Sequence, residues 1–206
     1  MKLYIDPGTG SMLFAVLIGI IGAVAYVFKE WAVKLKFLLT GGKKADTNAE
    51  KIPIVIFSDD KRYWSVFKPI CEEMNSRGID VVYMTASKDD PAFDENLQHL
   101  DAQFIGEGNR AFSKLNFLNA TMLISTTPGL DVFQWKRSKN VDYYVHVLHA
   151  ASNTCGYHMF GIDYYDAVLI SGNHHERDIR ALEKIRNLPA KELVMVGVPY
   201  MDAMVN

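Results

Sequence analysis

The sequence contains few cysteines and carries little net charge, and each shortage excludes a class of protein. Its 206 residues include two cysteines, Cys71 and Cys155, which stand far apart along the chain. Two isolated cysteines provide neither a disulfide framework nor a CxxC redox motif, and they fit a reducing compartment. The formal net charge is −2, with no basic stripe outside one short region, so we do not expect nucleic acid as a partner.

Recognisable cofactor motifs are also absent. The sequence GEG at residues 106–108 opens a predicted helix, but a third glycine is missing at the expected offset. A dinucleotide-binding loop would also follow the first strand, where this chain has FSDD at residues 57–60, and no Walker lysine pattern occurs. Cys155 and His158 have a plausible spacing for zinc ligands, but no second clean pair follows them. We therefore expect neither a cofactor nor a bound metal.

A long uncharged segment is present near the amino terminus. Residues 12–28, MLFAVLIGIIGAVAYVF, have no polar face, and their length approaches the roughly 20 residues that a membrane span needs. We predict a transmembrane helix over about residues 11–29. A cleaved signal peptide is the first alternative, but the segment lacks a clearly basic leader and a small-residue cleavage site. A buried core helix is the second alternative, and the length of the uncharged run argues against it.

The lysines around this segment indicate its orientation. They are concentrated on its carboxyl-terminal side, where Lys29, Lys34, Lys36, Lys43 and Lys44 follow it, whereas Lys2 alone precedes it. The positive-inside rule then places the amino terminus outside and the rest of the chain in the cytoplasm. We therefore expect a single-pass protein of the cytoplasmic membrane, with the lipid bilayer as a partner. Residues 1–39 form the predicted anchor, which ends in a juxtamembrane basic helix, and residues 40–50 form a polar linker.

From residue 51 to residue 206 the pattern changes to short apolar runs that alternate with helical segments. We predict strands over residues 52–57, 79–84, 103–105, 121–125, 141–148, 167–170 and 193–196, and helices over residues 64–77, 91–100, 109–118 and 173–188. Strands that are apolar without clean alternation, joined by helical crossovers, are typical of a parallel sheet covered on both faces. The predicted fold class is therefore α/β, a Rossmann-like domain of about seven strands.

Polar residues follow most of the predicted strands. In an open α/β sheet, ligands bind just outside the carboxyl ends of the strands. The candidate substrate-binding residues at these ends are Ser58, Asp59, Thr126, Thr127, Ser152, Asn153, Asn173 and His174. Asn173 and His174 also begin a predicted helix, whose free N–H groups could bind a phosphate. Capping of that helix by the Asn173 side chain is the alternative.

His149 is the candidate catalytic residue. It follows the strand predicted over residues 141–148, and a histidine with an ordinary pKa of about 6.5 can accept a proton from a hydroxyl nucleophile. A loop histidine without a chemical role is the alternative. His146 lies three residues earlier, on the opposite face of the strand, so the two do not form a metal pair. We expect His146 to be packed in the sheet and hydrogen-bonded.

Three runs of sequence resemble a known family. They are VDYYVHVLHA at residues 141–150, FGIDYYDAVLISGNHHERDI at residues 160–179 and KELVMVGVPYMDAM at residues 191–204. Together they resemble the amino-terminal half of the CDP-glycerol glycerophosphotransferases, the teichoic-acid primases and polymerases of the GT-B class. The opening YIDPGTGSMLF, at residues 4–14, is similar to membrane-anchored bacterial relatives. The resemblance covers roughly residues 51–204.

The resemblance implies a two-domain enzyme in which the first Rossmann-like domain binds the acceptor and the second binds the donor. It implies that His149 is the general base that deprotonates an acceptor hydroxyl. That hydroxyl attacks the β-phosphate of CDP-glycerol and releases CMP. The acceptor would be lipid-linked or a polyol phosphate. The sequence departs from the family pattern at Ala150, where glycine is usual, and at residues 151–154, which contain no lysine.

The sequence therefore predicts a membrane-anchored, glycerophosphotransferase-like protein of cell-envelope polymer synthesis. Since the chain ends at Asn206, we expect it to hold only the acceptor-side half and to be inactive alone. A partner or a further carboxyl-terminal half would supply the donor domain. Two alternatives remain open at this stage: a non-catalytic, membrane-tethered binding module with a GT-B-like fold, and a relative of the sugar-nucleotide epimerases, which share the two-domain fold.

Overall fold

The computed structural model describes residues 50–150, 152, 154–198 and 201. The predicted membrane anchor, nearly all of the predicted linker, and Asn153 lie outside this part of the chain. Among the residues that are described, no helix is both long enough and apolar enough to span a bilayer.

The described residues form a parallel sheet of seven strands. The strands are β1 (Ile52–Ser58), β2 (Val81–Thr85), β3 (Leu100–Phe104), β4 (Asn119–Ser125), β5 (Asn140–Val147), β6 (Ala167–Ile170) and β7 (Glu192–Met195). Their order is β3-β2-β1-β4-β5-β6-β7, and every neighbouring pair is parallel. This is the order of a Rossmann-like domain, continued by one strand. The predicted α/β class and parallel sheet are confirmed.

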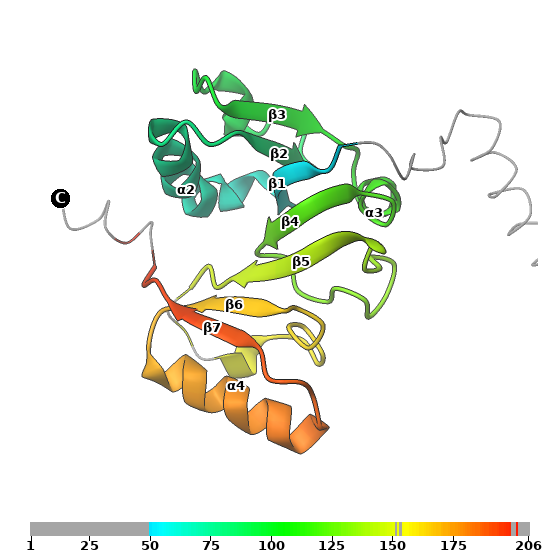
Figure 1. Cartoon of the computed structure of the whole chain (residues 1–206), viewed down its shortest axis with the longest axis vertical. Coiled ribbons are helices and arrows are strands. Elements are labelled where there is room, and N and C mark those ends of the chain that lie inside the picture. Colours follow the sequence, from blue (N-terminus) through cyan, green and yellow to red (C-terminus); the bar gives the residue numbers. More distant parts are fainter. Residues whose placement is uncertain (1–49, 151, 153, 199–200, 202–206) are drawn as a thin grey trace, which may run out of the picture. The chain divides into compact units, whose positions relative to one another are not determined.

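The sheet grows in two directions from β1. Val55 of β1 is in register with Val82 of β2 on one side and with Leu123 of β4 on the other. The chain first builds outward to β3 and then crosses back to add β4 through β7, as Figure 1 shows. The topological switch point therefore lies between β1 and β4, where open α/β sheets bind their ligands.

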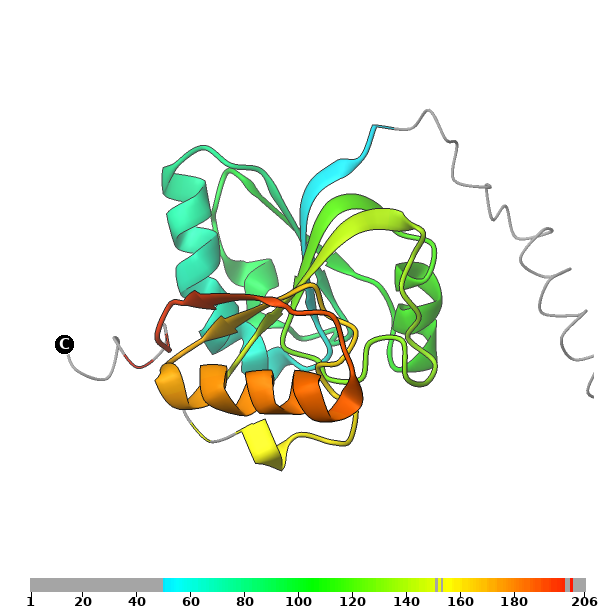
Figure 2. The same cartoon turned by 60° about the horizontal axis from the view of Figure 1, so that its bottom comes forward.

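Helices cover both faces of the sheet. The helical elements are α2 (Trp64–Ser76), α3 (Asn109–Leu115) and α4 (Asn173–Arg186), with the 3-10 turns η1 (Lys61–Tyr63), η2 (Pro91–Asp94) and η3 (Thr154–Gly156). Phe67 of α2 packs in the core cluster that contains Ile56, whereas Leu115 of α3 packs in the cluster that contains Val55 and Phe57. Since successive strand residues point to opposite faces, α2 and α3 lie on opposite sides of the sheet (Figure 2).

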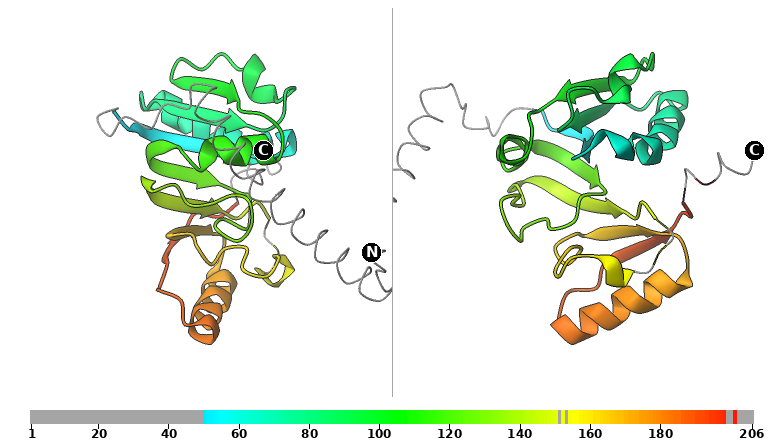
Figure 3. Two further views of the ribbon diagram at one scale, coloured as in Figure 1. Left: turned by 90° about the vertical axis from the view of Figure 1, so that its right-hand side faces the viewer. Right: turned by 180° about the vertical axis from the view of Figure 1, so that it is seen from behind.

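A third core cluster forms beneath α4. Ile179 of α4 is fully buried and packs with Leu148, Ile162, Val168 and Ile170. Figure 3 shows α4 and η3 together at the β7 end of the sheet, away from β3. This arrangement matters for the site, because η3 follows closely after His149 in the sequence.

The helix predicted over residues 91–100 is wrong. Only Pro91–Asp94 is helical, as the 3-10 turn η2, and β3 begins at Leu100 rather than at residue 103. The Asp90 side chain accepts a hydrogen bond from the Ala92 backbone N–H and caps this short turn. Pairing of Leu100 with Val81 of β2 then draws the chain into the sheet. The tertiary ladder therefore overrides the local helical pattern.

Leu123 tests how strongly the central strands stabilise the domain, because it is fully buried in β4. We expect Leu123→Ala to lower the free energy of unfolding by about 2–5 kcal/mol, since the truncation removes buried apolar surface and leaves a cavity. Urea-induced unfolding followed by circular dichroism measures the change. Thr121→Val, at an exposed position of the same strand, is the matched control and should change stability by no more than about 0.5 kcal/mol. Equal effects of the two substitutions would contradict this picture of the core.

Candidate functional site

The candidate site lies where β1, β4 and β5 end. Asp59 follows β1 directly, Thr126 and Thr127 follow β4, and His149 comes two residues after β5. Because the three strands are parallel and adjacent, their carboxyl ends share one edge of the sheet. Four of the sequence-predicted site residues therefore meet at the topological switch point and its neighbouring strand.

Aromatic side chains connect these strand ends. The His149 ring lies 5.0 Å from the Tyr63 ring and 6.4 Å from the Tyr157 ring, measured between centroids. On the β4 side, the Tyr165 hydroxyl donates a hydrogen bond of 2.5 Å to the Thr127 carbonyl oxygen. The histidine is thus bordered by one tyrosine from η1 and another from the loop after η3.

Several buried polar atoms at this edge have no hydrogen-bond partner among the described residues. They are Asp59 Oδ1, Thr126 Oγ1, Thr127 Oγ1 and His149 Nδ1. Thr126 is 0% exposed and Thr127 is 5% exposed, so water competes little for their hydroxyls. An unsatisfied buried polar group costs about 1–3 kcal/mol, and native proteins contain few of them. Their concentration at the switch point indicates a site for a polar ligand.

Partial burial tunes the acid–base properties of His149. Burial lowers the pKa of His149 below its ordinary value, the negative charge of Asp59 opposes that shift, and the positive charge of Arg62 adds to it. The imidazole is therefore neutral at pH 7, with a lone pair that can accept a proton. This is the protonation state that a general base requires.

Burial shifts the pKa of Asp59 in the opposite direction to that of His149. It raises the pKa of the Asp59 carboxyl, while the nearby Thr127 side chain lowers that pKa in part. The Thr127 hydroxyl nevertheless makes no hydrogen bond of ordinary geometry to the described residues. Asp59 Oδ1 and Thr127 Oγ1 are therefore both free to bind a third group between β1 and β4.

His146 belongs to the wall of the site and is unsuited to be its base. The side chain is fully buried, its Nε2 lies 3.1 Å from the Tyr157 hydroxyl, and its ring lies 4.8 Å from the Tyr165 ring. The expectation of a packed and hydrogen-bonded histidine is confirmed. Burial, reinforced by nearby His149, lowers the pKa of His146 to about 3, so this ring remains neutral at physiological pH.

Ser58 is used inside the protein. It is fully buried at the end of β1, and its hydroxyl donates a hydrogen bond of 2.8 Å to the Asp60 carbonyl oxygen. This bond shapes the turn that presents Asp59. The substrate-binding role predicted for Ser58 therefore stays a prediction, with its hydroxyl already engaged in an internal contact.

Asn173 and His174 lie two strands away from the switch point, where β6 leads into α4. Gly172 is the N-cap of α4 and no side chain caps the helix, so the suggested capping role of Asn173 is wrong. The His174 ring packs against the His175 ring, with centroids 3.9 Å apart. No hydrogen bond or ring contact among the described residues joins Asn173 or His174 to His149. Their predicted phosphate-binding role stays a prediction.

Ser152 lies in the loop between β5 and η3, and its side chain is exposed. Its carbonyl oxygen is 2.8 Å from Nε2 of His175, a buried residue that the sequence did not single out. Asn153 lies outside the described residues. The loop after His149 is thus connected to α4 through the backbone of Ser152.

The sequence analysis did not identify Tyr63 and Tyr157, which border the His149 ring, or Arg62, whose positive charge lowers the pKa of His149. A signal existed for Tyr63 and Arg62, because both follow the end of β1 at the switch point within five residues. No signal in the sequence identified Tyr157, since its approach to His146 and His149 depends on how the loop after η3 folds back. Tyr165 is buried beside these residues, and its ring lies 4.8 Å from the His146 ring.

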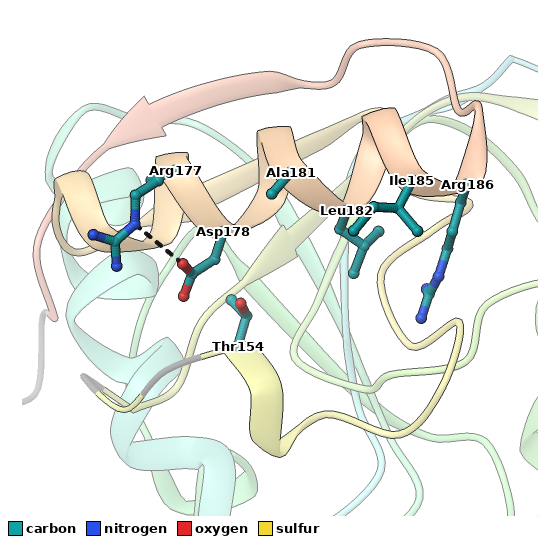
Figure 4. A pocket seen from close by; sticks show the side chains of 7 residues that line it. All are labelled: Thr154, Arg177, Asp178, Ala181, Leu182, Ile185 and Arg186. Carbon is teal, nitrogen blue, oxygen red and sulfur yellow. Dashed lines mark ion pairs between the residues drawn. The ribbon is translucent and has the colours of Figure 1, made fainter.

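The rest of the described residues contain no cluster of metal ligands, and three hollows on their surface are lined by residues outside the candidate site. Among these residues, no group of three or more histidine, cysteine, aspartate or glutamate side chains could hold a metal ion. A hollow of about 490 Å³ runs along the outward face of α4, lined by Thr154, Leu182, Ile185 and Arg186 among others (Figure 4). It contains none of the candidate site residues; of its lining residues, Arg177 forms an ion pair with Asp178, and Arg186 forms one with buried Asp163.

No protein-family model matches the chain, and neither a curated protein nor a solved structure is found to be similar to it. The evidence for the family resemblance is therefore limited to the sequence runs given above. The evidence for the candidate site is the geometry of the described residues.

The charges next to His149 allow a direct test of its environment. We expect Asp59→Asn to lower the pKa of His149 further, because it removes the negative charge that stabilises the imidazolium ion. Arg62→Gln should raise the same pKa, because it removes a repelling positive charge. NMR titration of the histidine ring signals measures both changes. Shifts in the same direction for the two variants would contradict the proposed electrostatics.

His146 should make the protein sensitive to acid. With a folded-state pKa of about 3 against an ordinary value of about 6.5, the unfolded chain binds the proton first as the pH falls. The stability contribution is present above pH 6.5 and is lost as the pH falls toward 3. When the pH falls from 6.5 to 5, the free energy of unfolding should decrease in both proteins. We expect the decrease to be about 1.5 kcal/mol smaller in His146→Phe than in the parent protein. Chemical unfolding at both pH values measures this, with His158→Gln, at an exposed site, as control.

Proposed function

We propose that this domain is the acceptor-side half of a membrane-anchored, glycerophosphotransferase-like enzyme. The observation that carries the proposal is that unpartnered polar atoms of Asp59, Thr126 and Thr127 lie at the same sheet edge as the neutral imidazole of His149, which senses the charge of Asp59. Such a constellation suits the binding and deprotonation of a hydroxyl group. The sequence resemblance supplies the reaction class, and the site supplies groups that fit the acceptor side of it.

In this proposal, hydrogen bonds from the site orient the acceptor hydroxyl before the reaction. The hydroxyls of Thr126 and Thr127 can donate or accept, and the Asp59 carboxylate can accept. His149 takes the hydroxyl proton as the acceptor oxygen attacks the β-phosphate of CDP-glycerol. A new P–O bond forms to the acceptor, the P–O bond to the CMP leaving group breaks, and CMP departs with the electron pair. General-base assistance of this kind accelerates reactions by about 10²–10⁴-fold.

Two further features support this assignment of roles. A span over residues 11–29 would hold the domain at the membrane, where a lipid-linked acceptor is presented at the cytoplasmic face. The GT-B class places the donor in a second domain that faces the first across a cleft. A carboxyl-terminal half or a separate partner would provide that donor site.

A non-catalytic binding module is the second candidate. Ala150 replaces the glycine that is usual in the family, and residues 151–154 contain no lysine. These departures lie directly after His149 and favour a domain that binds an acceptor-like ligand without transferring anything to it. Fold alone does not distinguish the two, because one architecture serves many functions.

A transfer assay on native membranes, which contain the protein together with whatever supplies the donor site, tests the proposal. Radiolabelled CDP-glycerol is the donor, and the measurements are CMP release and incorporation of label into membrane-bound polymer. We expect His149→Ala to reduce both rates by about 10²–10⁴-fold, because it removes the base. His158→Ala, an exposed histidine from the following loop, is the matched control and should retain the parent rate.

The outcomes separate the candidates. Equal rates for His149→Ala and His158→Ala would exclude His149 as the base. Saturable binding of a glycerol-phosphate oligomer, weakened by Thr126→Val but accompanied by no CMP release, would support the binding module. Binding of a UDP-sugar without any dependence on lipid would instead favour an epimerase-like relative.

A further inference from the structure

The sequence SGNHH at residues 171–175, between β6 and α4, contains a fully buried histidine outside the site. His175 is 0% exposed, and each of its ring nitrogens has a partner. Its Nδ1 lies 3.1 Å from Ser171 Oγ and 3.4 Å from the Ser171 backbone nitrogen, and its Nε2 lies 2.8 Å from the Ser152 carbonyl oxygen. A carbonyl oxygen can only accept, so Nε2 carries the proton and Nδ1 accepts from Ser171.

These bonds connect two loops that are distant in the sequence. Ser152 is the third residue after His149, whereas Ser171 follows β6 directly. The side chain of His149 makes no hydrogen bond to the described residues, so its position depends on its ring contacts with Tyr63 and Tyr157 and on the backbone on either side of it. β5 fixes the preceding backbone, and the bond from His175 anchors the backbone at Ser152, three residues after His149.

The neighbouring residues of the sequence SGNHH support this bond. A side chain at Gly172 would place its Cβ 2.8 Å from Nδ1 of His174, and Cβ atoms in proteins essentially never lie so close to another heavy atom. Glycine at this position therefore lets the His174 ring pack against His175 at 3.9 Å. On the next turn of α4, Thr154 of η3 points toward Asp178, as Figure 4 shows, so the loop lies against the helix beyond Ser152 as well.

We propose that His175 is a positioning residue that fixes the loop after His149 by donating a hydrogen bond to the Ser152 carbonyl oxygen. The proposal rests on the proposed function insofar as His149 is the base whose position matters. It assigns a role to the sequence SGNHH that differs from phosphate binding: the buried second histidine connects the β5 loop to the start of α4.

Two substitutions of His175 distinguish this role from simple packing. His175→Gln keeps an amide N–H at about the position of Nε2 and can still donate to Ser152, whereas His175→Asn is too short to reach it. In the full chain, purified in detergent micelles, we expect His175→Asn to increase amide hydrogen exchange over residues 148–157 by about tenfold. The NMR signals of the His149 ring should shift as well. His175→Gln should restore both measurements to values near those of the parent chain.

The result that would overturn the proposal is parent-like exchange over residues 148–157 in His175→Asn. Equal increases in both variants, spread over β6 and α4, would also overturn it, because they would indicate a packing role alone. The unsubstituted chain provides a test that does not depend on how the variants fold. Nitrogen-15 NMR should find the His175 proton on Nε2, in slow exchange, and a proton on Nδ1 instead would contradict the hydrogen-bond network.

These measurements are independent of catalysis. If His149→Ala retained full transfer activity while His175→Asn still increased hydrogen exchange over residues 148–157, the function proposed for His149 would be wrong. The positioning role of His175 would be supported. If His149→Ala were inactive and His175→Asn left hydrogen exchange over residues 148–157 unchanged, only the positioning role of His175 would be wrong.

Discussion

The parallel pairing of β1 with β4 is the constraint on which the site depends. β1 is buried on both faces, with Val55, Ile56 and Phe57 all fully inaccessible, and it has a hydrogen-bonded neighbour on each side. Because β1 lies inside the sheet, the chain must leave the sheet at the carboxyl end of this strand. Asp59 and Thr126 lie at the same edge. The chain after β1 leads into α2 on one face of the sheet, whereas Leu130 and Trp135, which follow β4, pack in the cluster on the other face, so polar side chains are brought together between the two connections.

The burial that stabilises the sheet also tunes the chemistry at its edge. His146 and His149 are three residues apart, yet one is sealed inside the sheet and the other is half-buried at its end. Desolvation disfavours the charged form of both, strongly for His146 and moderately for His149. The inner ring is thereby fixed as a neutral hydrogen-bonding group, while the pKa of the outer ring is lowered by partial burial and partly restored by Asp59. The different burial of the two rings therefore separates their acid–base properties.

The sequence predicted what depends on local pattern and missed what depends on distant contacts. The strands, their parallel arrangement and His149 at a strand end follow from apolar runs and their polar boundaries. The helix expected over residues 91–100 failed because pairing with β2 is a tertiary effect. The contact between Tyr63 and His149 spans 86 positions of the sequence, and the His175 bond to Ser152 spans 23. No periodicity encodes such pairs, so only the fold reveals them.

The charge distribution at the switch point fits an acceptor hydroxyl better than a phosphate. The two basic side chains that follow β1 have acidic partners, since Lys61 forms a hydrogen-bonded ion pair with Asp89 and Arg62 lies 3.7 Å from Asp60. The unpartnered atoms belong to two threonine hydroxyls, a carboxyl and a neutral imidazole, and none of these carries positive charge. A phosphate placed there would meet the negative charge of Asp59 without a dedicated cation, whereas a hydroxyl can donate to the carboxylate and accept from the threonines. The phosphates of a nucleotide-linked donor would therefore need cationic groups from outside this cluster, as expected if acceptor and donor are bound by different domains.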